Sequence, residues 1–244
     1  CCNRICNNLK YHLYRSEIHP LIVFGGYNTI QQEIMDPSSH IHKGNPDVIV
    51  LALMLELLTP HYGTPAWENK EAKEQLLTMF ESIIERSKSL VVVNTFIPLF
   101  YSTTGIVGED DQIDNNRLVH ELNRFIKTYA KEHSSRFFVI DWERILRIVG
   151  EQESMDYRYW YLSQAPFKKK FLNLYSEEIS KIVIALKGKS KKCLVLDCDN
   201  TLWGGIVGED GLNGIELNRN DYPGKAFYDF QKTLIWVLSL ILMV

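Results

Sequence analysis

Two aspartates separated by one residue, Asp197 and Asp199, are the side chains of this sequence whose type and spacing most clearly suggest chemistry. They follow the apolar run CLVL at residues 193–196, which predicts a buried strand. Residues two apart on a strand point to the same side. Both carboxylates are therefore expected at the carboxyl end of one strand, the edge at which open α/β sheets bind ligands.

Two neighbouring carboxylates repel each other unless a cation neutralises them, and Mg²⁺ is a hard cation that prefers oxygen ligands. With Asp197 and Asp199 as metal ligands, Asp197 can attack a phosphoryl group. Asp199 can protonate the leaving group and later activate water. The alternative is structural, because Asp199 or Asn200 can cap a helix or form a turn. The longer pattern, Asp-x-Asp-x-Thr followed by Leu-Trp-Gly-Gly, favours the catalytic interpretation.

Apolar runs alternate with amphipathic stretches before this motif, which predicts repeated strand–helix units. Parallel strands need crossover connections, so the expected fold is α/β, with a mostly parallel sheet in a three-layer arrangement. Expected strands lie at residues 21–24, 47–53, 90–94 and 137–140. Expected helices lie at residues 28–35, 67–88, 115–132, 142–149 and 166–186, with a loop over residues 98–111.

A polar, basic connector at residues 187–192 predicts two domains, residues 1–187 and residues 188–244. The second domain is expected to begin with the strand before Asp197. A helix at residues 223–234 and a second strand at residues 238–244 are expected to follow. The chain does not begin with methionine, so we expect it to be truncated at both ends.

Composition argues against several classes of partner. The chain has 244 residues, 45% of them hydrophobic and 23% charged, as in ordinary globular proteins. A formal net charge of −3 gives no reason to expect nucleic acid or an anionic membrane. An odd count of 5 cysteines does not suggest a disulfide framework, and a cytoplasmic location is expected.

The string DCDNT at residues 197–201 resembles motif I of the HAD superfamily, and residues 197–217 resemble its FkbH-like branch, subfamily IIIC. Further resemblances to the same family are carried by YRYWYLSQAPF at residues 157–167, KGKSKKCLVLD at residues 187–197, FGGYNTIQQEIMDPSS at residues 24–39 and PDVIVLAL at residues 46–53.

This resemblance implies an SGNH-hydrolase-like (flavodoxin-like) N-terminal domain and the incomplete start of a HAD-type Rossmannoid domain. It implies Asp197 as nucleophile, Asp199 as acid/base, Mg²⁺ as cofactor, and Thr201 and Asn200 as loop and substrate contacts. The turn at residues 208–211 would belong to a flap hairpin, for which Asp-Gly is a strong signal. The resemblance also implies the activity of some family members, which dephosphorylate a phosphoglyceryl group and leave the glyceryl unit on an acyl carrier protein for polyketide biosynthesis.

The sequence departs from the family pattern in ways that predict a catalytically inactive chain. The later Ser/Thr, Lys and acidic motifs of a HAD site do not appear. The first domain has no Gly-Asp-Ser and no Asp-x-x-His, although Asp156 lies near that position. Asn94 is interpreted as a capping residue or an oxyanion donor, and His61 and His120 as surface residues. Tyr157, Tyr159, Trp160 and Tyr161 could line a pocket or pack between domains.

Two functions therefore stay open. In the first, which the resemblance favours, the chain is expected to be a fragment of an FkbH-like phosphatase and glyceryl transferase that acts on a phosphorylated small molecule. The alternative is a non-catalytic SGNH-like module that docks an acyl carrier protein or a substrate.

Overall fold

The structure, a computed structural model, describes residues 2–26, 28–64, 66–98, 115–191 and 193–241. The chain divides into two compact units, Cys1–Ser190 and Lys191–Val244. The family of each unit stays a sequence prediction. Most of the loop expected at residues 98–111 lies outside the described residues.

A parallel sheet lies at the centre of the first unit. Among the described residues it has three strands in the order β1-β2-β3: Val48–Leu51, Leu90–Asn94 and Phe137–Ile140. All five residues of the central strand, β2, are buried. The parallel α/β fold expected from the sequence is thus confirmed. The apolar run at residues 47–53 is typical of a strand covered on both faces, but Val50 is 38% exposed because β1 is an outer strand.

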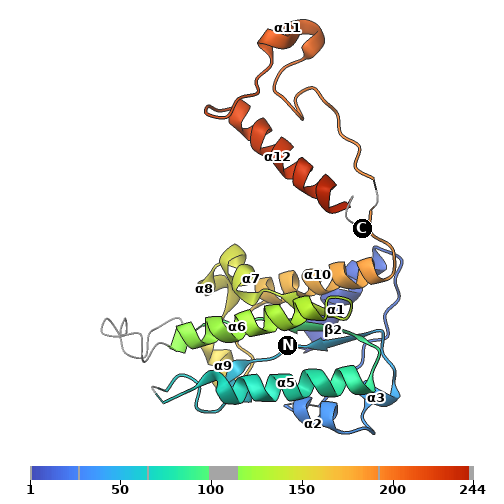
Figure 1. Cartoon of the computed structure of the whole chain (residues 1–244), viewed down its shortest axis with the longest axis vertical. Helices are drawn as coiled ribbons and strands as arrows, with labels where there is room; N and C mark the ends of the chain where they lie inside the picture. Colours follow the sequence, from blue (N-terminus) through green and yellow to red (C-terminus); the bar gives the residue numbers. More distant parts are fainter. Residues whose placement is uncertain (1, 27, 65, 99–114, 192, 242–244) are drawn as a thin grey trace. The chain divides into compact units, whose positions relative to one another are not determined.

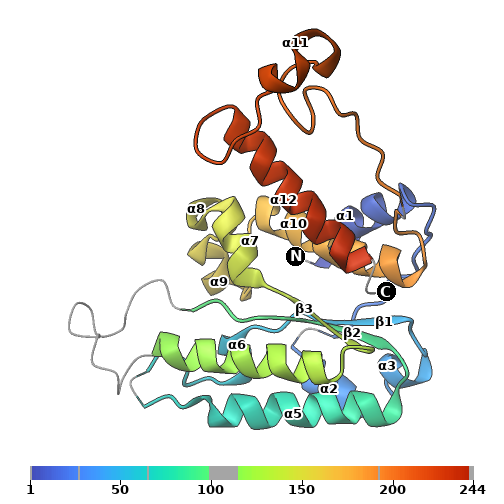
Figure 2. The same cartoon turned by 45° about the horizontal axis from the view of Figure 1, so that its top comes forward.

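Helices cover both faces of this sheet (Figures 1 and 2). Alternate side chains of β2 point to opposite faces, so Val91 and Val93 pack with α5 and α6, whereas Leu90 and Val92 pack with α1, α7 and α10. The helices of this unit are α1 Cys2–Tyr14, α2 Ile30–Met35, α3 His40–Lys43, α4 Leu55–Leu58, α5 Asn69–Arg86, α6 Asn115–Glu132, α7 Trp142–Val149, α8 Glu151–Ser154, α9 Tyr157–Ser163 and α10 Lys169–Leu186.

Two features of the amino-terminal part differ from expectation. Residues 21–24 are not a strand: Ile22 packs against the core, but Leu21 is 93% and Val23 62% exposed, and no ladder hydrogen bonds form. Proline before this segment and two glycines after it are residue types that strands disfavour. Helix α1 was not predicted, although Leu9 and Leu13, four residues apart, form its buried side against α10.

The second unit contains two helices, α11 Val207–Gly214 and α12 Gly224–Ile241, and no strand among its described residues. The predicted strand at residues 193–196 is wrong: the segment is unpaired, and Val195 is 87% exposed. A strand needs a neighbouring strand for its backbone hydrogen bonds, and the described part of this unit has none. Residues 238–241 continue α12 instead of starting a second strand, because neither Gly nor Pro interrupts the helix after Gly224. No helix in the described ranges is long and apolar enough to cross a membrane.

Two buried asparagines fix the carboxyl edge of the sheet. Asn94 Oδ1 accepts from the Leu53 amide at 2.8 Å, and Asn94 Nδ2 donates to the carbonyls of Leu53 at 2.8 Å and Thr95 at 3.0 Å. Asn123 on α6 holds Phe96 in the same way, at 2.7 Å and 2.8 Å. Leu53 and Phe96 lie just beyond the ends of β1 and β2, and each side-chain amide bonds to their backbone N–H and C=O groups as a neighbouring strand would. We call these two contacts the amide clamps.

The clamps predict a large loss of stability when either is cut. Asn94→Ala leaves the amide and carbonyl of buried Leu53 without partners, so the free energy of unfolding should fall by about 3 kcal/mol. Urea denaturation measures this difference. Asn7→Ala, at an exposed position of α1, should change stability by less than about 0.5 kcal/mol. Equal losses in the two variants would contradict the role of the clamp.

Asp141 links β3 to α7 and supplies a pH-dependent contribution. Partial burial raises the pKa of Asp141, but hydrogen bonds from Lys127 Nζ and the Arg144 amide outweigh burial and hold it below its ordinary value of 3.8. The Lys127–Asp141 distance is 2.7 Å. A carboxyl group whose pKa is lowered by folding stabilises the native state above its unfolded pKa and loses that contribution as the pH falls through the folded value.

The stability advantage of the native protein over Asp141→Asn should therefore be constant above about pH 5 and shrink below about pH 4. Urea titrations of both proteins at a series of pH values test this. A difference that stays the same down to pH 3 would rule out the ionic contribution.

Candidate functional site

The segment from Asp197 to Gly205 folds as a tight loop of the second unit. The carbonyl of Cys198 accepts hydrogen bonds from the amides of Thr201 at 3.2 Å and Leu202 at 2.8 Å. Asn200 has a φ of 54°, a left-handed conformation that asparagine tolerates better than most residues. Its Oδ1 accepts from the Gly205 amide at 2.9 Å. In this structure Asn200 and Thr201 therefore shape the loop.

Asp199 is half-buried and holds the two sides of this loop together. Its Oδ1 accepts from the indole Nε1 of Trp203 at 3.1 Å and from the amide of Val207 at 3.3 Å. These contacts join the loop to the first residue of α11. No specific role is predicted for Trp203 from the sequence, although an indole N–H needs an acceptor when it is partly buried.

Asp197 is exposed, and its Oδ1 accepts from the adjacent Cys198 amide at 2.8 Å. The two aspartates thus contact different partners: Asp197 bonds back to its neighbouring amide, and Asp199 bonds toward Trp203 and Val207. The prediction that both leave the end of one interior strand is wrong, because residues 193–196 are not a strand. What the structure retains is two carboxylates on one tight turn.

The segment that follows this loop, residues 204–216, has its two ends joined by a pair of backbone hydrogen bonds between Gly204 and Glu216, at 3.1 Å and 2.8 Å. A Cβ on Gly204 would lie 2.9 Å from the ring of Phe227, so only glycine fits without movement. The predicted hairpin is wrong at its tip, where residues 207–214 form α11. Asp210 Oδ2 accepts from the Ile206 amide at 2.8 Å and so favours the helix.

Helix α12 contacts this loop through the side chain of Gln231, for which the sequence predicted no role. Gln231 Nε2 donates to the carbonyl of Leu202 at 2.7 Å. A lone glutamine in an amphipathic helix gives no signal in the sequence, so only the folded structure reveals this contact.

The carboxylates of Asp197 and Asp199 have the oxygen ligands that Mg²⁺ prefers, but they supply few of them. Each uses Oδ1 for a protein hydrogen bond, and Oδ2 of each has no protein partner among the described residues. Magnesium takes six oxygen ligands and commonly keeps several waters. No group of three His, Cys, Asp or Glu side chains suited to a metal occurs within the described ranges. Asp197 and Asp199 would therefore hold the cation with water or phosphate oxygens filling the other positions.

The polar residues suggested in the first unit serve structural roles. Both N–H groups of Asn94 are used in its clamp, so none is left to donate to an oxyanion. Its Oδ1 accepts from Leu53 and does not cap a helix. Asp156 caps α9, and its hydrogen bonds with Arg158 lower its pKa to about 2. His61 is exposed, as expected, and the side chain of His120 is 58% exposed. On α9, Tyr157, Tyr159 and Tyr161 are exposed and Trp160 is half-buried.

The contacts of Asp199 predict how the loop responds to substitution. Asp199→Ala removes the acceptor for Trp203 Nε1 and the Val207 amide, so hydrogen exchange at that amide should accelerate about tenfold or more. Asp199→Asn keeps one oxygen acceptor and should have a smaller effect. Exchange measured by NMR separates the two variants, with exposed Asp221→Ala as control. Wild-type exchange in Asp199→Ala would show that this carboxylate does not hold the loop.

Comparison with known proteins gives one structural likeness. No protein-family model matches the chain, and no curated protein matches it. The chain is similar to the crystal structure of the N-terminal part of the protein BF1531 from Bacteroides fragilis, which contains a phosphatase domain complexed with Mg. The TM-score is 0.81 at 25% sequence identity, over 97% of this chain and 62% of that chain. The chain thus spans less than two thirds of that protein's length, and its fold is phosphatase-like.

Proposed function

We propose that this chain belongs to a Mg²⁺-dependent phosphatase that transfers a phosphoryl group through Asp197. The observation that carries the proposal is the Asp197–Asp199 turn, which lies in a chain whose fold is similar to a structure containing a phosphatase domain with Mg. A turn built only for structure needs Asp199 and Asn200 as acceptors. It does not need a second carboxylate at exposed position 197.

The hydrogen bonds assign a role to each carboxylate oxygen. Because Oδ1 of Asp197 accepts from the Cys198 amide, Oδ2 is the oxygen that attacks phosphorus and forms an aspartyl phosphate. Oδ1 of Asp199 already accepts from Trp203 and Val207, so Oδ2 carries the proton that passes to the leaving oxygen. While it carries this proton Oδ2 does not bind the cation, which Asp197 and the phosphoryl oxygens would then hold. The same Oδ2 then takes a proton from the water that hydrolyses the aspartyl phosphate. When bound, Mg²⁺ neutralises charge on the phosphoryl oxygens.

The substrate class and pathway rest on the sequence resemblance. We infer an FkbH-like enzyme of subfamily IIIC that removes phosphate from a phosphoglyceryl group and leaves the glyceryl unit on an acyl carrier protein in the cytoplasm. The block at residues 197–217 supports this assignment, since it extends well beyond the Asp-x-Asp pair. Thr201 and Asn200 are then loop residues next to the phosphoryl group.

Residues 1–244 by themselves should turn over phosphate esters very slowly. Asp197 is exposed to water, whereas charge stabilisation in phosphoryl transfer depends on preorganised groups in a site that excludes water. Among the described residues, Asp197 forms no ion pair with Lys or Arg, and the charge that develops on phosphate is left to the cation.

A non-catalytic binding module remains a second candidate for the first unit. The observation that favours it is the structural use of the polar residues at the sheet edge, because Asn94, Asn123 and Asp141 all bond to backbone groups. A carrier protein or a substrate would then bind this unit without reacting there.

Beryllofluoride, which bonds to a carboxylate oxygen as a phosphoryl mimic, tests the proposed nucleophile directly. A ¹⁹F NMR signal of the bound form should appear only when Mg²⁺ is present. It should disappear in Asp197→Asn and persist in Asp221→Asn, an exposed carboxylate of the same unit. A signal that survives in Asp197→Asn, or no signal at all with the native protein, would refute the role of Asp197.

Hydrolysis of p-nitrophenyl phosphate with Mg²⁺ tests the low activity separately. The native rate should lie within about twofold of the Asp197→Asn rate, because water reaches the carboxylate freely. Turnover that is lost in Asp197→Asn would overturn the expectation of inactivity while supporting the proposed nucleophile.

A further inference from the structure

A basic groove belongs to the first unit, whereas the Asp197 turn belongs to the second, and the function proposed above does not use the groove. It has a volume of about 390 Å³ and runs along α6 to the first turn of α7. Its lining residues are His120, Asn123, Arg124, Lys127, Thr128, Lys131 and Glu143. Three cations thus face a single carboxylate in a chain whose formal net charge is −3.

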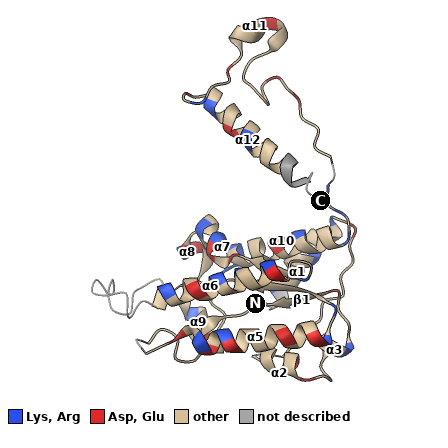
Figure 3. Ribbon diagram, in the orientation of Figure 1, with Lys and Arg blue, Asp and Glu red and all other residues tan. Residues whose placement is uncertain are grey.

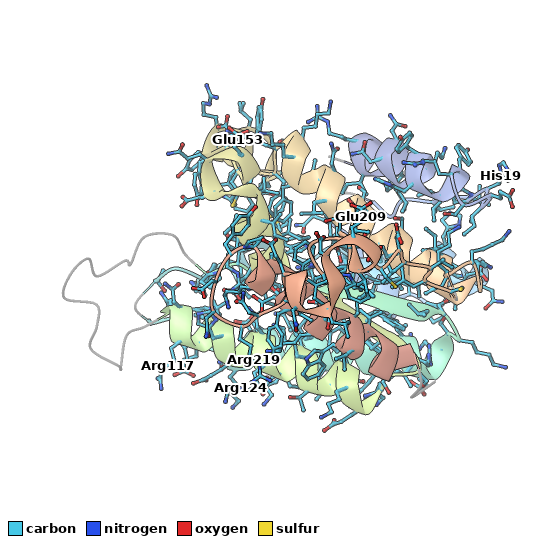
Figure 4. The ribbon with its side chains drawn as sticks, turned by 90° about the horizontal axis from the view of Figure 1, so that it is seen from above. His19, Arg117, Arg124, Glu153, Glu209 and Arg219 are labelled. Atoms are coloured by element: carbon cyan, nitrogen blue, oxygen red, sulfur yellow. The ribbon has the colours of Figure 1, made fainter. Side chains whose placement is uncertain are left out.

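The spacing of these cations places them on one side of the helix. Positions 120, 124, 127 and 131 follow each other at intervals of four, three and four residues, which brings their side chains onto one stripe. From Arg124 to Lys131 the helix rises about 10 Å. Figure 3 shows Lys and Arg recurring along α6, and Figure 4 shows Arg124 extending outward from this helix.

The ion pairs of the groove leave two of its cations without a carboxylate partner. Lys127 is bound to Asp141 at 2.7 Å, and His120 lies 3.9 Å from Glu143. Neither Arg124 nor Lys131 has an ion-pair partner among the residues that the structure describes. Two unpaired cations on either side of a paired one attract an anion of small size more strongly than isolated surface charges do.

The floor of the groove is held in place independently of any ligand. Asn123 is 3% exposed and is fixed to the backbone of Phe96 by its clamp. Asp141 caps α7 by accepting from the Arg144 amide at 3.0 Å, so this helix end is already occupied by a carboxylate. An anion in the groove must therefore bind the side chains of α6 and not the amino end of α7.

We propose that this groove binds a small phosphorylated anion through Arg124 and Lys131. The planar guanidinium of Arg124 can donate two parallel hydrogen bonds to a phosphate group. Lys131 supplies a second positive charge two helical turns away. The hydroxyl group of Thr128 lies between them in the lining and can donate a further hydrogen bond.

Calorimetric titration of the full chain with pyrophosphate, without Mg²⁺, tests this site independently of the proposed phosphatase chemistry. Arg124→Gln and Lys131→Gln should each weaken binding about tenfold. Arg117→Gln is the matched control: it removes the same charge from the same helix, but Arg117 is paired with Glu121 and lies outside the groove. It should weaken binding less than twofold.

Asp141→Asn should change pyrophosphate affinity in the opposite direction. This substitution keeps an oxygen to cap α7 and releases Lys127 from its ion pair, so pyrophosphate should bind several-fold more tightly. A purely structural role of Asp141 predicts no such gain.

Three results would overturn the proposal. Binding that is unchanged in Arg124→Gln would exclude the groove. Equal weakening in Arg117→Gln would show that the whole face of α6 attracts an extended acidic partner. Succinate binding as tightly as pyrophosphate would show that charge alone, and not the phosphate group, is recognised.

Discussion

Backbone groups that have no strand neighbour determine much of this structure. A buried N–H or C=O without a partner is costly, and the chain satisfies several of them with side-chain amides and carboxylates. In the first unit, Asn94 and Asn123 bond to the backbone where the parallel strands end. In the second unit, where no strand is described, Asp199, Asn200 and Asp210 accept from backbone amides that are exposed or only partly buried. Asn and Asp at such positions suggest catalysis when only the sequence is considered.

This double use explains which parts of the candidate site could be foreseen. The sequence predicts that Asp197 and Asp199 lie close together, and the structure places both on one tight turn, while their catalytic role stays a prediction. It could not reveal that Asp199 is tied to Trp203 and Val207, because that contact depends on where α11 begins. Nor could it reveal the groove, whose lining joins α6 to Glu143 across the turn into α7.

The fold of the first unit was predictable wherever a helix or strand carries its own periodic pattern. The limits of β2, β3, α6 and α7 agree with those expected, because apolar runs or a helical apolar stripe end at clear polar residues. Predictions failed where an apolar run needs a partner that the described chain does not provide. Residues 21–24 and 193–196 are both apolar, yet neither pairs with a strand in the described part of the chain. An apolar run predicts that a segment can form a strand, but the strand forms only where a neighbouring strand supplies backbone hydrogen bonds.

The central strand has a consequence for the accuracy of folding. Residues 91–93 are all valine, so sliding β2 by one residue along its neighbours would place valine against both helical layers again. Hydrophobic matching alone therefore distinguishes the correct alignment from its shifted alternative only weakly. Asn94 resolves this ambiguity, since its amide meets Leu53 in one alignment only. A polar residue at the strand end thus acts as the stop that sets the position of an otherwise uniform strand.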